Sequence, residues 1–279
     1  MKSYNRARED VGNIILLEHV NVTVPDQGIA TFFYVTGLGL TRDPFVDFGP
    51  FNVWVNCGEQ QFHLPTAAPQ VLRGHVGVVA GSLDDLQERL GRVARRLEGT
   101  RFSWTRSPRH LEVTCPWGNR IRCFEPGKYR MPLGIAYVEF DVPRGSAQGI
   151  ARFYNDVIGA PAIVKRNTCE VAVGRGQSLR FHETTSRLPD YDGHHIAVYV
   201  TDFSAPHREL SARGLITEES DEHQYRFTSI FDPATGDTLY ELEHEVRSLY
   251  HPMYARHLTN RNPAQSFGHY VPGRDRFVP

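Results

Sequence analysis

Alternating apolar and polar residues mark short strands, and four of them open similar stretches of the chain. The opening strands fall at 17–24, 75–79, 135–142 and 195–200. Each is followed by apolar residues spaced three to four apart, as on one face of a helix, and then by further alternating runs. The pattern predicts an α+β fold of four βαβββ modules, starting near residues 14, 74, 134 and 194.

The modules form two tandem repeats at an offset of about 120 residues. His75 and His195 both open a strand, and 195 − 75 = 120. Phe33-Tyr34 recurs as Phe153-Tyr154 at the same offset. Such self-similarity indicates duplicated supersecondary units. We expect a first repeat over 14–126, a second over 134–245, and an irregular C-terminal tail over 246–279.

Composition and charge exclude several classes of partner. The net charge is −1, and no basic block is present, which argues against a nucleic-acid partner. The sequence contains no apolar run near 18 residues, so we expect no membrane span. The polar first ten residues lack the apolar core of a signal peptide, and the four cysteines show no CxxC spacing. These features favour a reduced, cytoplasmic protein.

Two segments of the first module carry a resemblance to a known family. Glu18-His19-Val20-Asn21-Val22-Thr23-Val24-Pro25-Asp26 is followed by Phe32-Phe33-Tyr34-Val35-Thr36-Gly37-Leu38-Gly39-Leu40, and Asp232-Pro233 with Gly236 precedes a Glu-bearing last strand. The pattern resembles the vicinal oxygen chelate superfamily, which includes glyoxalase I, bleomycin-resistance proteins and type I extradiol dioxygenases. The resemblance implies that modules pair into cups, each able to bind a divalent metal through its first and last strands. It also implies a homodimer, since dimers are common in that superfamily.

The resemblance places candidate metal ligands at matched positions of the modules. The first-strand positions are His19, His75, Tyr137 and His195, and the last-strand positions are His63, Glu125, His182 and Glu243. Because side chains alternate along a strand, Glu241 and Glu243 are both candidates for the inward-facing position of the fourth module, and Arg122 and Glu125 for that of the second.

Two pairings of the modules remain open. If the outer modules pair, one cup gathers His19, His63, His195 and Glu243, which is the set we favour. If adjacent modules pair, the competing set is His19, His63, His75 and Glu125. We expect a single strong metal site, because Tyr137 stands where the other modules supply histidine.

The ligand types suggest an oxygenase. Two or three imidazoles with one carboxylate suit Fe(II), and Zn, Ni and Mn are alternatives. The resemblance to extradiol dioxygenases gives catalytic roles to His182 and His223, although Tyr137 and Ser229 depart from that pattern. We expect an Fe(II) ring-cleaving dioxygenase acting on a small aromatic substrate. A glyoxalase-type isomerase or lyase and a metal-free binding or resistance protein are the alternatives.

Overall fold

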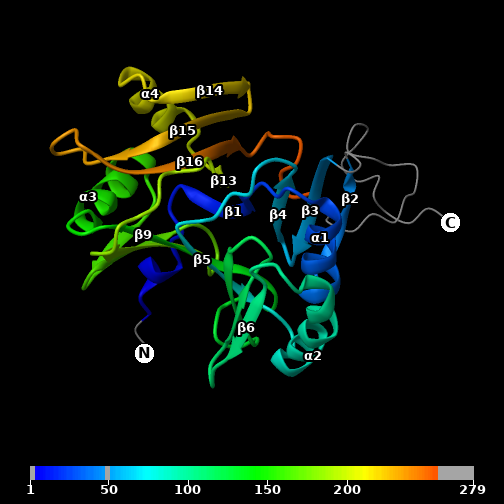
Figure 1. Ribbon diagram of the computed structural model, residues 1–279. Helices are drawn as coiled ribbons and strands as arrows, with labels where there is room; N and C mark the ends of the chain where they lie inside the picture. The colour runs from blue at the N-terminus through cyan, green and yellow to red at the C-terminus, as the bar shows by residue number, and fades with distance from the viewer. Residues whose placement is uncertain (1–3, 48–50, 257–279) are drawn as a thin grey trace.

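The computed structural model describes residues 4–47 and 51–256, and the strands of this part form two eight-stranded sheets (Figure 1). The four βαβββ modules begin with β1 (Ile14–Asn21), β5 (Gly74–Val79), β9 (Gly134–Pro143) and β13 (His195–Val200). The predicted fold class and the module starts are therefore confirmed.

The first and last modules build one sheet, here called the outer sheet. Its strand order is β14-β15-β16-β13-β1-β4-β3-β2, with β1 and β13 antiparallel at the centre. β4 and β16 run parallel to β1 and β13, respectively. The remaining strands are β2 (Thr41–Asp47), β3 (Asn52–Cys57), β4 (Gln60–Pro65), β14 (Ile216–Asp221), β15 (Gln224–Phe231) and β16 (Thr238–Ser248).

The two middle modules build the inner sheet in the same way. Its order is β10-β11-β12-β9-β5-β8-β7-β6, with β5 and β9 antiparallel at the centre. Its other strands are β6 (Ser103–Arg106), β7 (Leu111–Thr114), β8 (Arg120–Phe124), β10 (Ala162–Lys165), β11 (Thr168–Ala172) and β12 (Ser178–Thr184). Each sheet thus takes one module from each of the repeats expected over 14–126 and 134–245.

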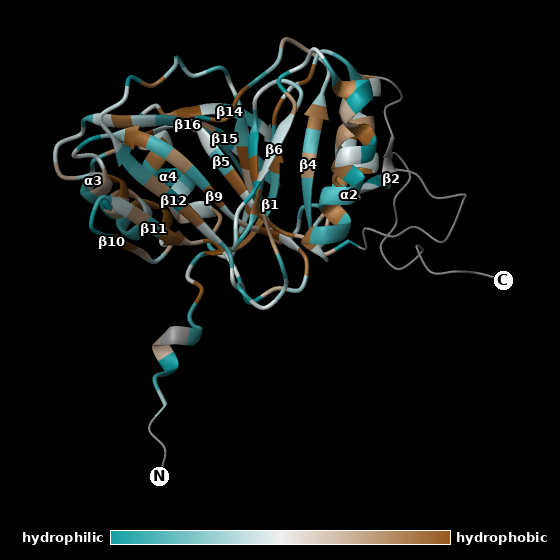
Figure 2. Cartoon of the chain, turned by 60° about the horizontal axis from the view of Figure 1, so that its bottom comes forward, coloured by the Kyte–Doolittle hydropathy of each residue, from teal (hydrophilic) through white to brown (hydrophobic). Residues whose placement is uncertain are grey.

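Helices from different modules pack on each other. α2 (Leu83–Val93) packs on η2 (Phe32–Gly37), and α4 (Ser204–Ala212) packs on η5 (Phe153–Ile158). The side chain of Ser82 caps α2 by accepting from the N–H of Asp85, as the sequence predicts. The alternating bands along α2 in Figure 2 show its apolar and polar faces.

The predicted helices at 29–38 and 146–158 each change from α-helix to π-helix. α1 (Gln27–Thr31) continues into η2, and α3 (Ala147–Arg152) continues into η5, both as π-helix. The same irregularity at equivalent places supports the duplication. A short 3-10 helix, η1 (Arg6–Glu9), precedes β1 and projects from the sheets in Figure 2, while η4 (Ala94–Leu97) follows α2.

The last strand extends beyond the predicted repeat. β16 runs to Ser248 and so includes the first residues of the stretch expected as tail, 246–279. Turns follow as far as Arg256, and residues 257–279 lie outside the described part. All four cysteines are buried and free. Within the described ranges, no helix has both the length and the apolar character that a membrane crossing requires.

Candidate metal centre

Three histidines come together on one face of the outer sheet. His63 on β4 and His195 on β13 both lie beside Asn21 of the strand between them, and His19 stands two residues before Asn21 on β1. Because side chains two residues apart share a face of a strand, the three imidazoles point to the same side. The opposite face, with Val20 and Phe62, packs into the hydrophobic core.

The geometry of the three rings suits a metal ion. One ring nitrogen from each of His19, His63 and His195 lies within 4.8 Å of the other two. Within residues 4–47 and 51–256, His19 Nε2, both nitrogens of His63 and His195 Nε2 are buried without a hydrogen-bond partner. Unpaired buried polar atoms are costly, and a coordinated cation would satisfy them. The donor set therefore fits a divalent ion, and imidazole suits Zn, Cu, Fe and Ni.

Burial keeps two of these imidazoles neutral. Desolvation lowers the pKa of His63 well below its usual value, and the neighbouring His19 and His195 lower it further. Desolvation also lowers the pKa of His195, although Glu245 opposes that shift. Metal binding requires the neutral imidazole, so these shifts prepare both side chains for coordination at neutral pH.

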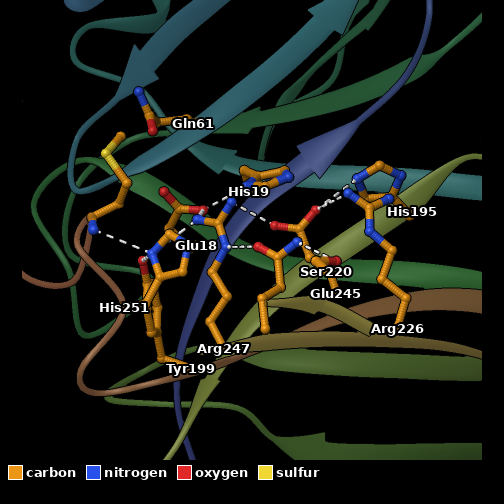
Figure 3. Close-up of polar contacts among 12 residues, drawn as sticks. Glu18, His19, Gln61, His195, Tyr199, Ser220, Arg226, Glu245, Arg247 and His251 are labelled. Atoms are coloured by element: carbon orange, nitrogen blue, oxygen red, sulfur yellow. Dashed lines mark hydrogen bonds and ion pairs between the residues drawn. The ribbon is translucent and has the colours of Figure 1, made fainter. Parts of the chain in front are cut away.

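The remaining imidazole is oriented by the residue that precedes it. Glu18 Oε2 lies 2.5 Å from His19 Nδ1 (Figure 3), which leaves His19 Nε2 available to a metal ion. Burial raises the pKa of Glu18, but Arg247 and His19 outweigh it and lower the pKa to about 2. Glu18 is thus a fixed carboxylate behind a metal-facing imidazole, an arrangement that sets the tautomer of metal-binding histidines.

Stacking orients His63. Its ring lies 3.9 Å from that of Trp54, centroid to centroid, at an interplanar angle of 19°. Trp54 is the cross-strand neighbour of His63 on β3. The aromatic wall therefore fixes the ring without occupying either of its nitrogens.

Two carboxylates flank the histidines, and both are held by arginine. Glu243 Oε1 lies 3.3 Å from His195 Nδ1 and 2.7 Å from Arg226, and the side chain is about a quarter exposed. Glu245 Oε2 lies 3.6 Å from His195 Nε2 and accepts from Arg226 at 2.6 Å. Arg247 contacts the other oxygen of Glu245 at 2.5 Å. Burial would raise the pKa of Glu245, but Arg247 and His195 lower it well below the usual value.

The strand register identifies Glu245, rather than Glu243, as the counterpart of His63. His63 pairs with Asn21, two residues after the first-strand His19. In the last module the residue two after His195 is Ala197, and it pairs with Glu245. Glu243 instead pairs directly with His195, and neither carboxylate belongs to the group of mutually close donors formed by the three histidines. Counting residues from the Asp232-Pro233 turn missed Glu245 because the β15–β16 hairpin is long and carries two register shifts.

The other candidates lie elsewhere. His75 and Glu125 belong to the second module, whose strands β5 and β8 are in the inner sheet, so the structure does not bring them to His19. His182 is on β12 of the inner sheet, where its Nδ1 lies 3.0 Å from Thr168 Oγ1. The spacing of His182 from His195 along the chain did not show this, because the two residues lie in modules that do not share a sheet.

His223 lies in the turn between β14 and β15, with its Nε2 3.3 Å from Glu222 on the surface. Neither His182 nor His223 joins the histidine cluster. Sequence reasoning also missed Glu18, Arg226 and Arg247, which surround the histidines. A charged residue within an otherwise apolar strand, as Glu18 is in Leu17–Val22, was the available signal.

Comparison with solved structures identifies the fold. A provisionally assigned dioxygenase from Bacillus subtilis matches with a TM-score of 0.58 at 15% identity, covering 85% of this chain and 86% of that one. Glyoxalase I from Zea mays matches with a TM-score of 0.59 at 13% identity, covering 86% and 94%, respectively. No protein-family model and no curated protein sequence matches the chain. The structural matches confirm the fold implied by the sequence resemblance, while identities this low leave the activity open.

Proposed function

We propose that this chain, which has the fold of the vicinal oxygen chelate superfamily, is a metal-dependent oxygenase acting on a small aromatic substrate. The observation that carries the proposal is the convergence of His19, His63 and His195, whose free nitrogens are buried. An Fe(II) ion there would bind neighbouring substrate oxygens and activate dioxygen.

The number of available ligands favours an oxygenase. His19, His63 and His195 would hold the ion through three imidazoles, which would leave room for further ligands. A chelating substrate and dioxygen would both need such room. Both nearby carboxylates are engaged by arginine, since Arg226 holds Glu243 and Glu245, and Arg247 holds Glu245. We propose Glu245 as the carboxylate of the site. It lies close to His195 and adds negative charge without taking a ligand position of the ion.

The residues of the chain have separable tasks in this proposal. His19, His63 and His195 hold the ion, and Glu18 keeps the proton of His19 on Nδ1. Trp54 shields His63 from water and offers an apolar ring beside the site. Glu245 is the buried carboxylate beside His195 that Arg226 and Arg247 keep ionised, and its charge would help to balance that of the bound ion.

A glyoxalase-type isomerase is the second candidate. The supporting observation is Glu245 itself, an ionised carboxylate 3.6 Å from His195 Nε2 that could move a proton next to a metal-polarised carbonyl. The structural likeness to maize glyoxalase I is consistent with this alternative. Such an enzyme would consume no oxygen.

Metal analysis with oxygen uptake tests the proposal. Purified protein should contain about one iron per chain and consume oxygen with catechols, and His195→Ala should abolish both. His207→Ala is the matched control, because His207 is a partly exposed histidine on α4 that contacts Glu219 and Tyr225 and lies outside the histidine cluster. Zinc or nickel, with turnover but no oxygen uptake, would favour the isomerase. Full-length protein that binds no metal would overturn both and leave a binding protein.

A further inference from the structure

The inner sheet repeats the geometry of the metal centre with different side chains. His75 pairs with Glu139 across the central strands, and Gly77 pairs with Tyr137. On the last strands, Arg122 pairs with Gly77, and Arg180 pairs with Glu139. The register that relates His19, His63, His195 and Glu245 in the outer sheet therefore places Tyr137, Arg180, His75 and Arg122 at the equivalent inner positions.

Three of these inner side chains, His75, Tyr137 and Arg180, contact one another in a chain. His75 Nε2 lies 3.0 Å from the hydroxyl of Tyr137, and the guanidinium of Arg180 lies 4.0 Å from the centre of the Tyr137 ring. Gly77 makes room for that ring, because a Cβ at this position would approach it to 2.0 Å. Two guanidiniums where the outer sheet has an imidazole and a carboxylate would repel a divalent cation.

Both arginines retain donors that face no protein acceptor. Arg122 donates Nε to Glu112 at 3.0 Å, and Arg180 Nη2 lies 3.3 Å from Glu170. Within residues 4–47 and 51–256, neither guanidinium makes another hydrogen bond or ion pair. Each guanidinium therefore keeps N–H groups available to donate hydrogen bonds, and the planar guanidinium group suits a carboxylate.

Further positive charge converges on this face. Burial lowers the pKa of Lys128, and Arg109, Arg180 and Arg122 lower it further. Four carboxylates are nearby: Glu112 and Glu170 hold the arginines, Glu139 lies 3.8 Å from His75, and Asp141 lies 3.6 Å from Arg120. Arg109 and Lys128 add charge that no carboxylate of the described ranges pairs.

Three aromatic rings lie beside these cations, with Arg180 over Tyr137 and Lys128 over Phe124 and Tyr129. Phe124, Tyr129 and Tyr137 contact one another with ring centroids 5.2 to 6.2 Å apart. Tyr129 and Met131 are only partly buried and pack over this cluster from the connection between the two repeats. A planar apolar ring could stack there while its anionic group meets the two guanidiniums.

We propose that this face of the inner sheet, at Arg122, Arg180, Tyr137 and His75, binds a small aromatic carboxylate. The carboxylate lies between Arg122 and Arg180, and the ring lies against Tyr129 and Tyr137. The metal centre of the outer sheet is separate, so this binding does not depend on the proposed oxygenase activity.

A titration of the full chain with 4-fluorobenzoate, followed by 19F NMR, tests the proposal. We expect saturable binding in the millimolar range or tighter. Arg122→Gln and Arg180→Gln should each weaken it about tenfold, the effect of losing one charge-assisted hydrogen bond. Arg122→Lys, which keeps the charge but not the planar guanidinium group, should give a smaller loss in a protein with unchanged thermal unfolding. Arg187→Gln, an exposed arginine in a loop, is the matched control and should bind normally.

Three outcomes would overturn the assignment. If 4-fluorobenzoate does not bind, or if Arg187→Gln weakens binding as much as the Arg122 and Arg180 variants do, there is no site at these arginines. Binding lost in His195→Ala but kept in both arginine variants places the carboxylate on the metal instead. If inorganic phosphate or cyclohexanecarboxylate displaces 4-fluorobenzoate as effectively as benzoate does, the site does not recognise an aromatic ring.

Discussion

Replacing Arg247 with methionine is the sharpest test of the charge arrangement behind the metal centre. The guanidinium lies between two buried carboxylates, 3.0 Å from Glu18 Oε2 and 2.5 Å from Glu245 Oε1. All three side chains are less than a tenth exposed. Breaking a buried ion pair costs about 3–5 kcal/mol, because the remaining charge stays uncompensated.

The structure places the expected loss at the low end of that range. Glu18 keeps its contact with His19, and Glu245 keeps its contact with Arg226. We therefore expect Arg247→Met to lower the free energy of unfolding by about 3 kcal/mol in the presence of a chelator, rather than by the sum of two broken pairs. A divalent ion on the three histidines would supply positive charge near Glu245. The loss should then shrink by about 1.4 kcal/mol, which equals a tenfold tighter metal affinity in the variant.

Urea unfolding followed by tryptophan fluorescence measures both quantities, once with EDTA and once with saturating Zn²⁺. Arg213→Met is the matched control, because Arg213 makes an exposed pair with Glu209 worth less than about 0.5 kcal/mol. A loss below about 1 kcal/mol with EDTA would show that Arg247 does not compensate buried charge. An equal loss with and without metal would show that the ion does not act on Glu245.

Three further predictions concern single side chains. His195→Ala should remove bound metal, measured by elemental analysis, whereas His75→Ala should leave it unchanged; the reverse result would contradict the pairing of ligands described above. Glu18→Gln should weaken metal affinity about 10- to 100-fold in a competition with a chelating dye, and unchanged affinity would remove its orienting role. Burial lowers the pKa of His244 to about 4, so its neutral form stabilises the fold fully above pH 6.5, and this stability is lost as the pH falls towards 4. The loss of unfolding free energy should reach about 3 kcal/mol. In His244→Gln, the free energy of unfolding should depend less steeply on pH between 6.5 and 4. An unchanged pH dependence would contradict this role of His244.

Much of the architecture could be predicted from residue spacing. The module starts follow from strands that begin with apolar alternation, and the duplication follows from Phe33-Tyr34 and its copy at Phe153-Tyr154. The pairing of the outer modules does not follow from spacing, because it depends on contacts between residues some 180 apart, such as those of His19 with Ala197. Local patterns carry no information about which sheet edges meet across such a distance.

The ligand positions on the last strands were harder to predict for a physical reason. Turn residues fix where a hairpin reverses, but bulges change how many residues separate the turn from a given cross-strand pair. β8 reaches its ligand position at Arg122, three residues after Asn119, whereas β16 reaches it at Glu245, eight residues after Asp237. The number of residues between the turn and the ligand position therefore differs from one module to another. The pairing of the last strand with the parallel first strand, in contrast, locates the ligand position in each module.

The contrast between the two sheets shows how much of the chemistry is set by side chains at fixed positions. Both sheets place four side chains at the same register points, two from the central strands and two from the strands parallel to them. In the outer sheet these are three imidazoles and a carboxylate, which a divalent cation can satisfy. In the inner sheet the two last-strand points carry arginine, so the same geometry favours an anion. A double change of Arg122 and Arg180 to histidine should therefore move the inner sheet towards metal binding. Even with both changes, Tyr137 would occupy one ligand position, and Gly77 would have to keep accommodating its ring. We expect at most weak zinc binding in that variant by calorimetry, with the further change Tyr137→His needed for a site comparable to the outer one. Tight binding by the double variant alone would show that the tyrosine is no obstacle.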